Sequence, residues 1–172
     1  MDQESPLTAE KVVNTYSRTQ LAQIIKRYGE ERWADRIASF IVETRSRKPI
    51  KTTLELVDVI KAAIPAAARR RGGHPARRTF QAIRIEVNDE LKSLEVALRE
   101  VIGSLKMKGR VTTISYHSLE DRIVKRIFKE ESLPEFGARL MILTKRPVRP
   151  SSEEIAVNPR SESAKLRAAE KL

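Results

Sequence analysis

The sequence contains no cysteine, which excludes disulfide bonds and thiolate metal sites and suits a reducing compartment. It has only two histidines, His74 and His117, and this scarcity argues against a histidine-rich zinc site. No apolar run approaches the roughly 18–20 residues that a membrane-spanning helix needs. The N-terminal stretch MDQESPLTAEK is polar and acidic, unlike a secretory signal. We therefore expect a soluble cytoplasmic protein without a bound metal.

Basic residues are in clear excess over acidic ones. The 172 residues include 34 lysines and arginines against 23 acids, for a net charge of +11. Such an excess favours a polyanionic partner, either a nucleic acid or an anionic membrane surface, and charge alone does not distinguish them. Hydrophobic residues make up 40% of the chain, which is enough for the core of one ordinary domain or of two small ones.

The first third of the chain has the periodicity of short amphipathic helices. Apolar residues recur at helical intervals, and serine or threonine precedes several segments as a candidate N-cap. Gly29, Pro49 and Pro65 indicate where predicted helices end. The segments are SPLTAEKVVNTY (5–16), SRTQLAQIIKRYG (17–29), EERWADRIASFIVETRSRK (30–48) and TTLELVDVIKAAI (52–64). They predict a small helical domain.

The composition then changes to an arginine-rich stretch, RRRGGHPARRTFQAIR (69–84), with six arginines and no acid. Clustered arginines can bind the phosphate groups of a nucleic acid. The plain alternative is that the stretch is a solvated linker with a few ion pairs. The absence of acids favours contact with RNA or DNA. A long helical pattern follows over 76–109, with a possible bend near Asn88-Asp89.

Polar side chains of this second pattern could read base edges, or could instead be surface residues or part of the bend. The candidate RNA-binding residues are Arg69, Arg70, Arg71, Arg77, Arg78, Gln81, Arg84 and Asn88.

The remainder alternates between strand and helix patterns, as in an α/β protein. RVTTISYH (110–117) predicts a strand, LEDRIVKRIFKEE (119–131) a helix, and ARLMILTKRPV (138–148) a second strand. SSEEIAVNPRSES (151–163) predicts a loop with a helical turn. The local propensity of AKLRAAEKL (164–172) favours a helix over a strand.

Tyr116-His117-Ser118 lies where the first strand meets the next helix. Ser118 and Asp121 fit the spacing of a capping box, which is the plain interpretation. The carboxyl end of a strand is also where α/β sheets bind ligands, so Tyr116 or His117 could face a crevice. A Ser/His/acid triad is disfavoured, because close neighbours rarely point at one another and no G-x-S-x-G motif is present.

Four blocks of the sequence resemble one family. HPARRTFQAIRIEVNDEL (74–91), GRVTTISYHSLEDRIVKRIFKE (109–130) and NPRSESAKLRAAEK (158–171) resemble signature blocks of the bacterial small-subunit ribosomal RNA cytosine-N4 methyltransferases. YGEERWADRIASFIV (28–42) resembles a helix of that family's inserted domain. Two departures are Tyr116, where the family commonly has phenylalanine, and Glu162, in a block that is usually more basic.

The resemblance implies an α/β fold: the C-terminal part of a class I Rossmann-like methyltransferase sheet, preceded by a small all-helical inserted domain. Residues 1–73 would be the helical, substrate-recognition domain, and residues 74–172 the C-terminal half of the methyltransferase domain. Strands are implied at 110–116, 138–145 and 164–170. The last of these overrules the local preference for helix, because tertiary context outweighs propensity.

The resemblance also implies the activity, S-adenosylmethionine-dependent N4-methylation of a cytidine in small-subunit ribosomal RNA, with no membrane partner. The family's donor-binding residues precede the point where this chain begins. No cofactor-binding or catalytic residue is therefore assigned, His117 is only a candidate on the acceptor side, and S-adenosylmethionine is expected not to bind this chain alone. A missing N-terminal half is a possible partner for the edge of the 110–116 strand.

Two alternatives stay open. The chain could be a non-catalytic basic RNA-binding module, acting alone or as one half of a split enzyme. It could also be a helical basic scaffold without a sheet.

Overall fold

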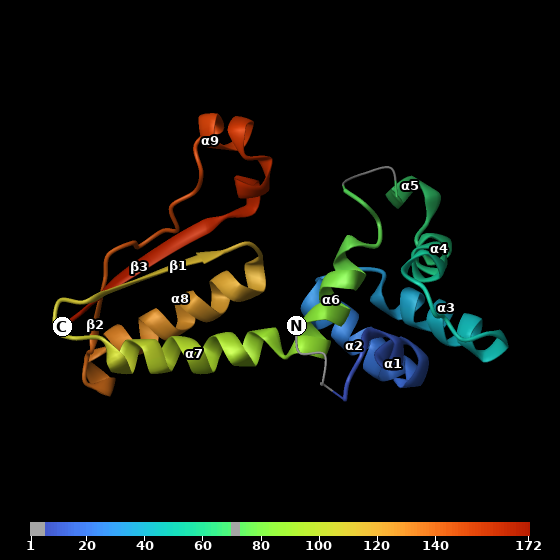
Figure 1. The fold of residues 1–172 in the computed structure, drawn as a ribbon, viewed down its shortest axis with the longest axis horizontal. Helices are drawn as coiled ribbons and strands as arrows, with labels where there is room; N and C mark the ends of the chain where they lie inside the picture. The colour runs from blue at the N-terminus through green and yellow to red at the C-terminus, as the bar shows by residue number, and fades with distance from the viewer. Residues whose placement is uncertain (1–5, 70–72) are drawn as a thin grey trace. The chain divides into compact units, whose positions relative to one another are not determined.

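The computed structural model describes residues 6–69 and 73–172, which divide into two compact units (Figure 1). The first unit ends at Glu90 and the second begins at Leu91. This division falls later than the boundary expected after residue 73, because α6 (Arg77–Asn88) packs on α2 (Arg18–Gly29). The assignment of an inserted domain within a methyltransferase domain stays a prediction.

The first unit is helical, as the periodicity predicted. The side chain of Thr8 caps the first helix, while Ser17 with Gln20 and Thr52 with Glu55 form capping boxes at two others. Besides α2 and α6, its helices are α1 (Ala9–Thr15), α3 (Ala34–Arg47), α4 (Thr53–Ala63) and the single-turn α5 (Ala66–Arg69).

The helical unit has its own hydrophobic core. Helix α2 lies between α3 and α6, and the side chains of Leu21, Ile25, Ile37 and Ile60 are fully buried there. Near its C-terminal end α2 approaches α6 so closely that a Cβ on Gly29 would lie 2.6 Å from the carbonyl oxygen of Arg78. Only glycine fits this contact without moving backbone.

A hydrogen bond also connects the end of α1 to α6. The Tyr16 hydroxyl donates to Glu86 Oε1 over 2.8 Å. Burial, followed by the hydrogen bond and the negative charge of Glu86, raises the pKa of Tyr16 to about 12. The phenol therefore stays protonated and keeps donating at every physiological pH.

The predicted bend is present between α6 and α7 (Glu90–Ser104). Asp89 has a left-handed backbone with φ of 47°, which interrupts the helix. Arg84 donates to both carboxylate oxygens of Glu90, over 2.9 and 3.0 Å, and Asn88 Nδ2 donates to the Arg84 carbonyl over 2.9 Å. These contacts hold the interruption in place.

The second unit contains three strands, which is incompatible with a purely helical scaffold. Its sheet has the order β1-β3-β2, and β3 pairs antiparallel with both neighbours. After α7 its elements are β1 (Arg110–Ser115), α8 (Ser118–Ser132), η1 (Pro134–Phe136), β2 (Leu140–Ile142), α9 (Ser152–Val157), η2 (Pro159–Ser163) and β3 (Lys165–Lys171).

The last strand forms against its local helical propensity, as the resemblance implied. Ala169 is opposite Val111 on one side and Ile142 on the other, and its side chain is fully buried. Two ladders of hydrogen bonds and this burial outweigh a helix preference of a few tenths of a kcal/mol per residue.

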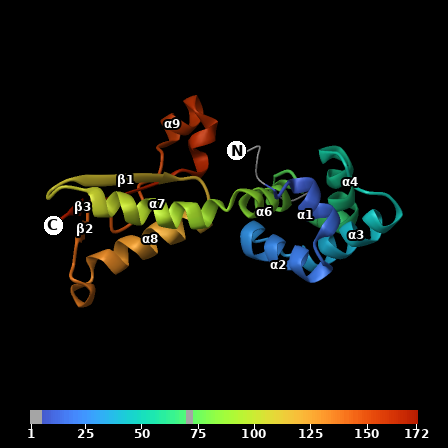
Figure 2. The same ribbon diagram turned by 60° about the horizontal axis from the view of Figure 1, so that its bottom comes forward.

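Helices α7 and α8 cover one face of this sheet (Figure 2). Their buried residues Ile102, Val124, Ile127 and Phe128 join Val111 in a small second core. Salt bridges also connect the two helices, among them Arg99 to Glu130 at 2.6 Å and Arg126 to Glu95 at 2.8 Å. The sheet is therefore packed firmly on this side.

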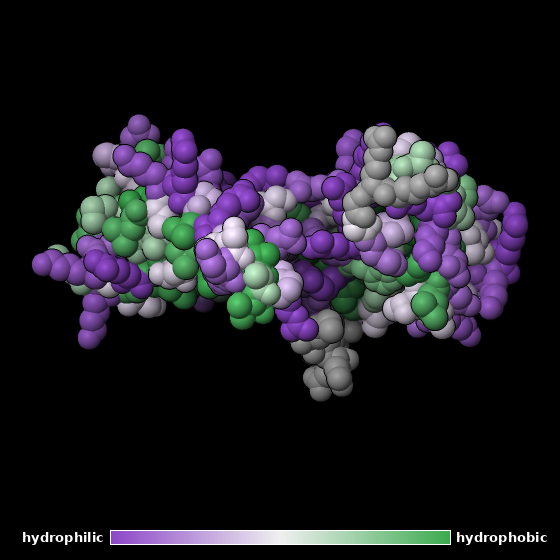
Figure 3. Space-filling view, turned by 90° about the horizontal axis from the view of Figure 1, so that it is seen from above, coloured by the Kyte–Doolittle hydropathy of each residue, from purple (hydrophilic) through white to green (hydrophobic). Residues whose placement is uncertain are grey.

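The opposite face of the sheet is open to solvent within the described residues. Ile114, Met141 and Val148 are 57%, 45% and 54% exposed. Hydrophobic surface is visible on the strand-containing unit from that side (Figure 3). In addition, β1 pairs only with β3 among the described strands, so its other edge is unpaired. Sheets of doubly wound α/β folds are normally covered on both faces.

None of the described helices is both long and apolar enough to cross a bilayer.

Candidate functional site

His117 lies between the carboxyl end of β1 and the start of α8, and it acts as the N-cap of that helix. Its Nδ1 accepts from the backbone N–H of Glu120 over 3.3 Å. In return, Glu120 Oε2 accepts from the backbone N–H groups of Tyr116 at 3.0 Å and His117 at 3.3 Å. The capping box is thus His117 with Glu120.

The expectation of a capping box made by Ser118 and Asp121 is therefore wrong by one residue. The helix begins at Ser118, so the residue before it has the extended backbone of a cap, and an imidazole nitrogen replaces the usual hydroxyl or carboxylate oxygen. An imidazole whose Nδ1 accepts has its proton on Nε2, and that atom lies 3.3 Å from Glu120 Oε1. The hydrogen bond at Nδ1 orients the ring.

Asp121 does not cap α8; it forms a buried ion pair with Arg167 of β3. Its Oδ1 accepts from Arg167 Nε over 2.7 Å, and Lys165 Nζ lies 3.5 Å from Oδ2. Burial raises the pKa of the Asp121 carboxyl, but the hydrogen bond and charge of Arg167, with Lys165, outweigh it, so the pKa lies below its usual value. The pair joins the start of α8 to the start of β3.

The arginine-rich stretch is only partly described. Arg69 is exposed at the end of α5, whereas Arg70 and Arg71 lie outside the described residues. Arg77 and Arg78 begin α6, whose N-cap residue Ala76 makes no side-chain cap. Arg77 is exposed and makes no ion pair within the described part of the chain, while Arg78 Nη1 donates to the carbonyl of Glu30 over 3.2 Å.

The three candidates farther along α6 have partners inside the helical unit. Gln81 Nε2 donates to the carbonyl of Tyr28 over 2.9 Å, which joins α6 to α2. Arg84 and Asn88 stabilise the interruption before α7, as described above. Contact with RNA stays a prediction for all three, as it does for the exposed Arg69, Arg77 and Arg78.

Sequence patterns missed Glu120 and Arg167. Histidine is an uncommon N-cap, so the pattern did not predict Glu120 as its capping partner, although Glu120 was one of the acids of the disfavoured triad. Arg167 is 46 positions from Asp121, and a single sequence gives no signal for such a pair beyond a charge in a strand that is otherwise part of the core. No cluster of three or more potential metal ligands occurs among the described residues.

A family model described as the MraW methylase family matches residues 1–172. The chain belongs to the MraW methylase family. The resemblance seen in the sequence blocks is thereby confirmed, as is the fold class: part of an α/β methyltransferase, with a helical unit before a mixed helix and strand unit.

Curated relatives of this family carry the name "Ribosomal RNA small subunit methyltransferase H". The chain is 52% identical to the one from Halothermothrix orenii, 53% to that of Heliobacterium modesticaldum and 53% to that of Acidothermus cellulolyticus. Each match covers 100% of this chain but only 59%, 59% and 56% of the relative. The chain therefore spans less than two thirds of the length of these MraW-family proteins.

Proposed function

We propose that this chain is the acceptor-side part of an enzyme that transfers a methyl group from S-adenosylmethionine to N4 of a cytidine in small-subunit ribosomal RNA. The observation that carries the proposal is the match along the entire chain to proteins named as small-subunit ribosomal RNA methyltransferases. The open face and unpaired β1 edge support it, because they are where the rest of a larger sheet would pack.

The residues of this chain do not fit a site for S-adenosylmethionine. No glycine-rich turn follows a strand in the sequence, and the acids beside the carboxyl end of β1 already have partners: Glu120 binds the cap and Asp121 binds Arg167. We place donor binding in the part of the relatives that this chain does not span, and the chain alone is expected to be inactive.

The role that remains for this chain is to bind and position the RNA. A cytidine must leave its stack before its N4 atom is accessible, and transfer to an exocyclic amine depends mostly on alignment. His117 suits positioning better than general base catalysis, because its Nδ1 lone pair accepts the cap hydrogen bond. It holds the Tyr116-His117 turn at the sheet end where α/β proteins bind ligands.

Arginine contacts to phosphate predict salt-dependent RNA binding by the helical unit. Replacing Arg77 and Arg78 with alanine is expected to weaken binding of small-subunit ribosomal RNA and to reduce the slope of log K against log salt by about 0.7–0.9 per lost phosphate contact. Filter binding at several salt concentrations measures both quantities.

A matched control removes the same charge elsewhere on the helical unit. Lys51 and Lys61 lie outside the arginine-rich stretch, and their replacement with alanine should leave the slope unchanged. Equal losses in the two double variants would show that only net charge matters, which would contradict a role for Arg77 and Arg78.

The second candidate function is a non-catalytic RNA-binding module, acting alone or as half of a split enzyme. The net charge of +11 and the separate core of the helical unit favour it. It shares the RNA binding predicted above. A module that acts alone predicts no methyl transfer even when the remaining part of the relatives is supplied, whereas half of a split enzyme predicts methyl transfer only with its separate partner chain.

A further inference from the structure

Eight of the nine arginines of the strand-containing unit fall into two groups. One group is neutralised: Arg99, Arg110, Arg126, Arg139 and Arg167 each form a salt bridge with a carboxylate. The other group consists of Arg146, Arg149 and Arg160, which are exposed and form no salt bridge with any described residue. The adjacent Lys145 is likewise exposed and forms no salt bridge with a described residue. Unpaired, solvent-facing arginines are available for an external anion.

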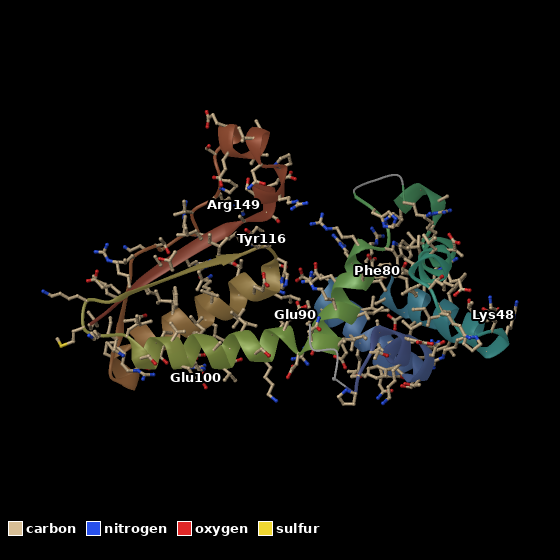
Figure 4. The ribbon with its side chains drawn as sticks, in the orientation of Figure 1. Lys48, Phe80, Glu90, Glu100, Tyr116 and Arg149 are labelled. Atoms are coloured by element: carbon tan, nitrogen blue, oxygen red, sulfur yellow. The ribbon has the colours of Figure 1, made fainter. Side chains whose placement is uncertain are left out.

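Sheet topology places this second group at one end of the sheet. Leu166 lies between Ile114 of β1 on one side and Val148 on the other. Arg146 and Arg149 flank Val148, and Arg160 lies on η2, which leads directly into β3. Because β3 is antiparallel to β1, its first residues lie beside the carboxyl end of β1. Tyr116 and Arg149 are labelled there (Figure 4).

The backbone that carries these cations is held in place. Val148 and Leu166 exchange two hydrogen bonds of 2.9 Å, and prolines at 147 and 150 restrict the segment around them. In η2, Pro159 is at the start, and the Ser161 hydroxyl donates to the carbonyl of Asn158 over 2.8 Å. A ligand would therefore order mainly side chains, which lowers the entropic cost of binding.

Tyr116 adds an aromatic ring at the same end. It is 56% exposed, although its own backbone N–H is held by the Glu120 carboxylate at 3.0 Å. An exposed ring on a fixed backbone beside several unpaired cations is the combination used to bind single-stranded nucleic acid, in which bases stack and phosphates pair with cations.

We propose that Tyr116, Lys145, Arg146, Arg149 and Arg160 form a second RNA-binding surface, separate from the arginine-rich stretch of the helical unit, that holds single-stranded RNA next to the target nucleotide. The inference rests on the proposed function. Phosphates contact the four cations, and a base stacks on Tyr116. Nearby acids Glu153, Glu154 and Glu162 oppose phosphate binding, and Glu162 is closest in sequence to Arg160.

The test is fluorescence anisotropy of the 172-residue chain with a short, dye-labelled single-stranded oligocytidine over a series of salt concentrations. A triple variant with Arg146, Arg149 and Arg160 changed to alanine is expected to bind more weakly, with a salt slope reduced by up to about 2. Tyr116→Leu should weaken binding about fivefold or more, whereas Tyr116→Phe should retain it. Glu162→Gln should tighten binding.

A matched triple variant controls for net charge. Lys106, Lys108 and Lys125 are also exposed but lie outside the proposed surface, so Lys106→Ala, Lys108→Asn and Lys125→Ala should leave affinity and slope unchanged. Asparagine is chosen at 108 because Lys108 has a positive φ of 62°. Circular dichroism of each variant checks that the fold is retained.

The outcomes separate this inference from the function on which it rests. Weaker RNA binding by the variant that lacks Arg146, Arg149 and Arg160, with unchanged binding by the control variant, supports the second surface. If binding is lost only on replacing Arg77 and Arg78, the second surface is wrong while RNA binding by the helical unit stands. If the wild-type chain binds no RNA at low salt, both are overturned.

Discussion

Replacing Asp121 with alanine is expected to destabilise the strand-containing unit by about 3 kcal/mol, because it leaves Arg167 buried without its counter-ion. Arg167 is only 6% exposed and Asp121 only 9%. This value is at the low end of the range measured for buried ion pairs. The reasons are that 12% of the Asp121 side chain stays exposed and that Lys165 also lies beside its carboxylate. Hydrogen exchange of the β1 and β3 amides, measured by mass spectrometry, reports the opening of this unit directly.

The pH dependence of this pair follows from the lowered pKa of Asp121. A carboxyl with a lower pKa in the folded state contributes stability above its unfolded pKa, near 4, and loses that contribution as the pH falls through the folded value. The wild-type chain should therefore lose more stability than Asp121→Asn between about pH 6 and pH 3.

A control acid distinguishes the pair from a general charge effect. Glu100 is exposed on α7 and forms no salt bridge with a described residue, so Glu100→Ala should change stability by less than about 0.5 kcal/mol. An Asp121→Ala variant as stable as Glu100→Ala would show that the buried pair contributes nothing.

The second large effect is expected at Gly29, where any side chain collides with backbone. The added Cβ of Gly29→Ala would lie 2.6 Å from the Arg78 carbonyl oxygen and 3.1 Å from its carbon. Separating α2 from α6 to relieve this contact should cost about 1–3 kcal/mol. That cost exceeds the roughly 0.5–1 kcal/mol that alanine gains over glycine in a helix, so the net effect is destabilising.

Gly103 in α7 provides the matched substitution, since nothing lies within 4 Å of its added Cβ. Gly103→Ala should be neutral or stabilising by up to about 1 kcal/mol. The only tryptophan, Trp33, packs against the core of the helical unit, so its fluorescence during urea unfolding follows that unit. A Gly29→Ala variant with an unchanged midpoint would contradict the close packing of α2 and α6.

The sequence predicted the elements of the fold well where one local signal dominated. Apolar periodicity and cap residues such as Thr8 and Thr52 located the helices of the first unit. The bend at Asn88-Asp89 was also predicted, because asparagine and aspartate tolerate the left-handed backbone found at Asp89. These features depend on neighbours a few residues apart.

Predictions failed or stayed open where distant residues decide the outcome. The strand at 165–171 forms because β1 and β2 pair with it, which overrides the helical propensity of its own residues. Asp121 was assigned to a cap because Arg167, its actual partner, is remote in sequence. Likewise, the hydrogen bond from Gln81 to the Tyr28 carbonyl joins residues 53 positions apart, and no local pattern predicts it, while contact of Gln81 with RNA stays a prediction.

The most direct test of the account is methyl transfer with the missing part supplied. The region of the Halothermothrix orenii relative outside the match would be joined to this chain, and small-subunit ribosomal RNA would be incubated with S-adenosylmethionine and analysed for N4-methylcytidine. We expect the modified nucleoside with the joined protein and none with the 172-residue chain alone. Methylation by the chain alone would contradict the account, as would a joined protein that is inactive where the intact relative is active.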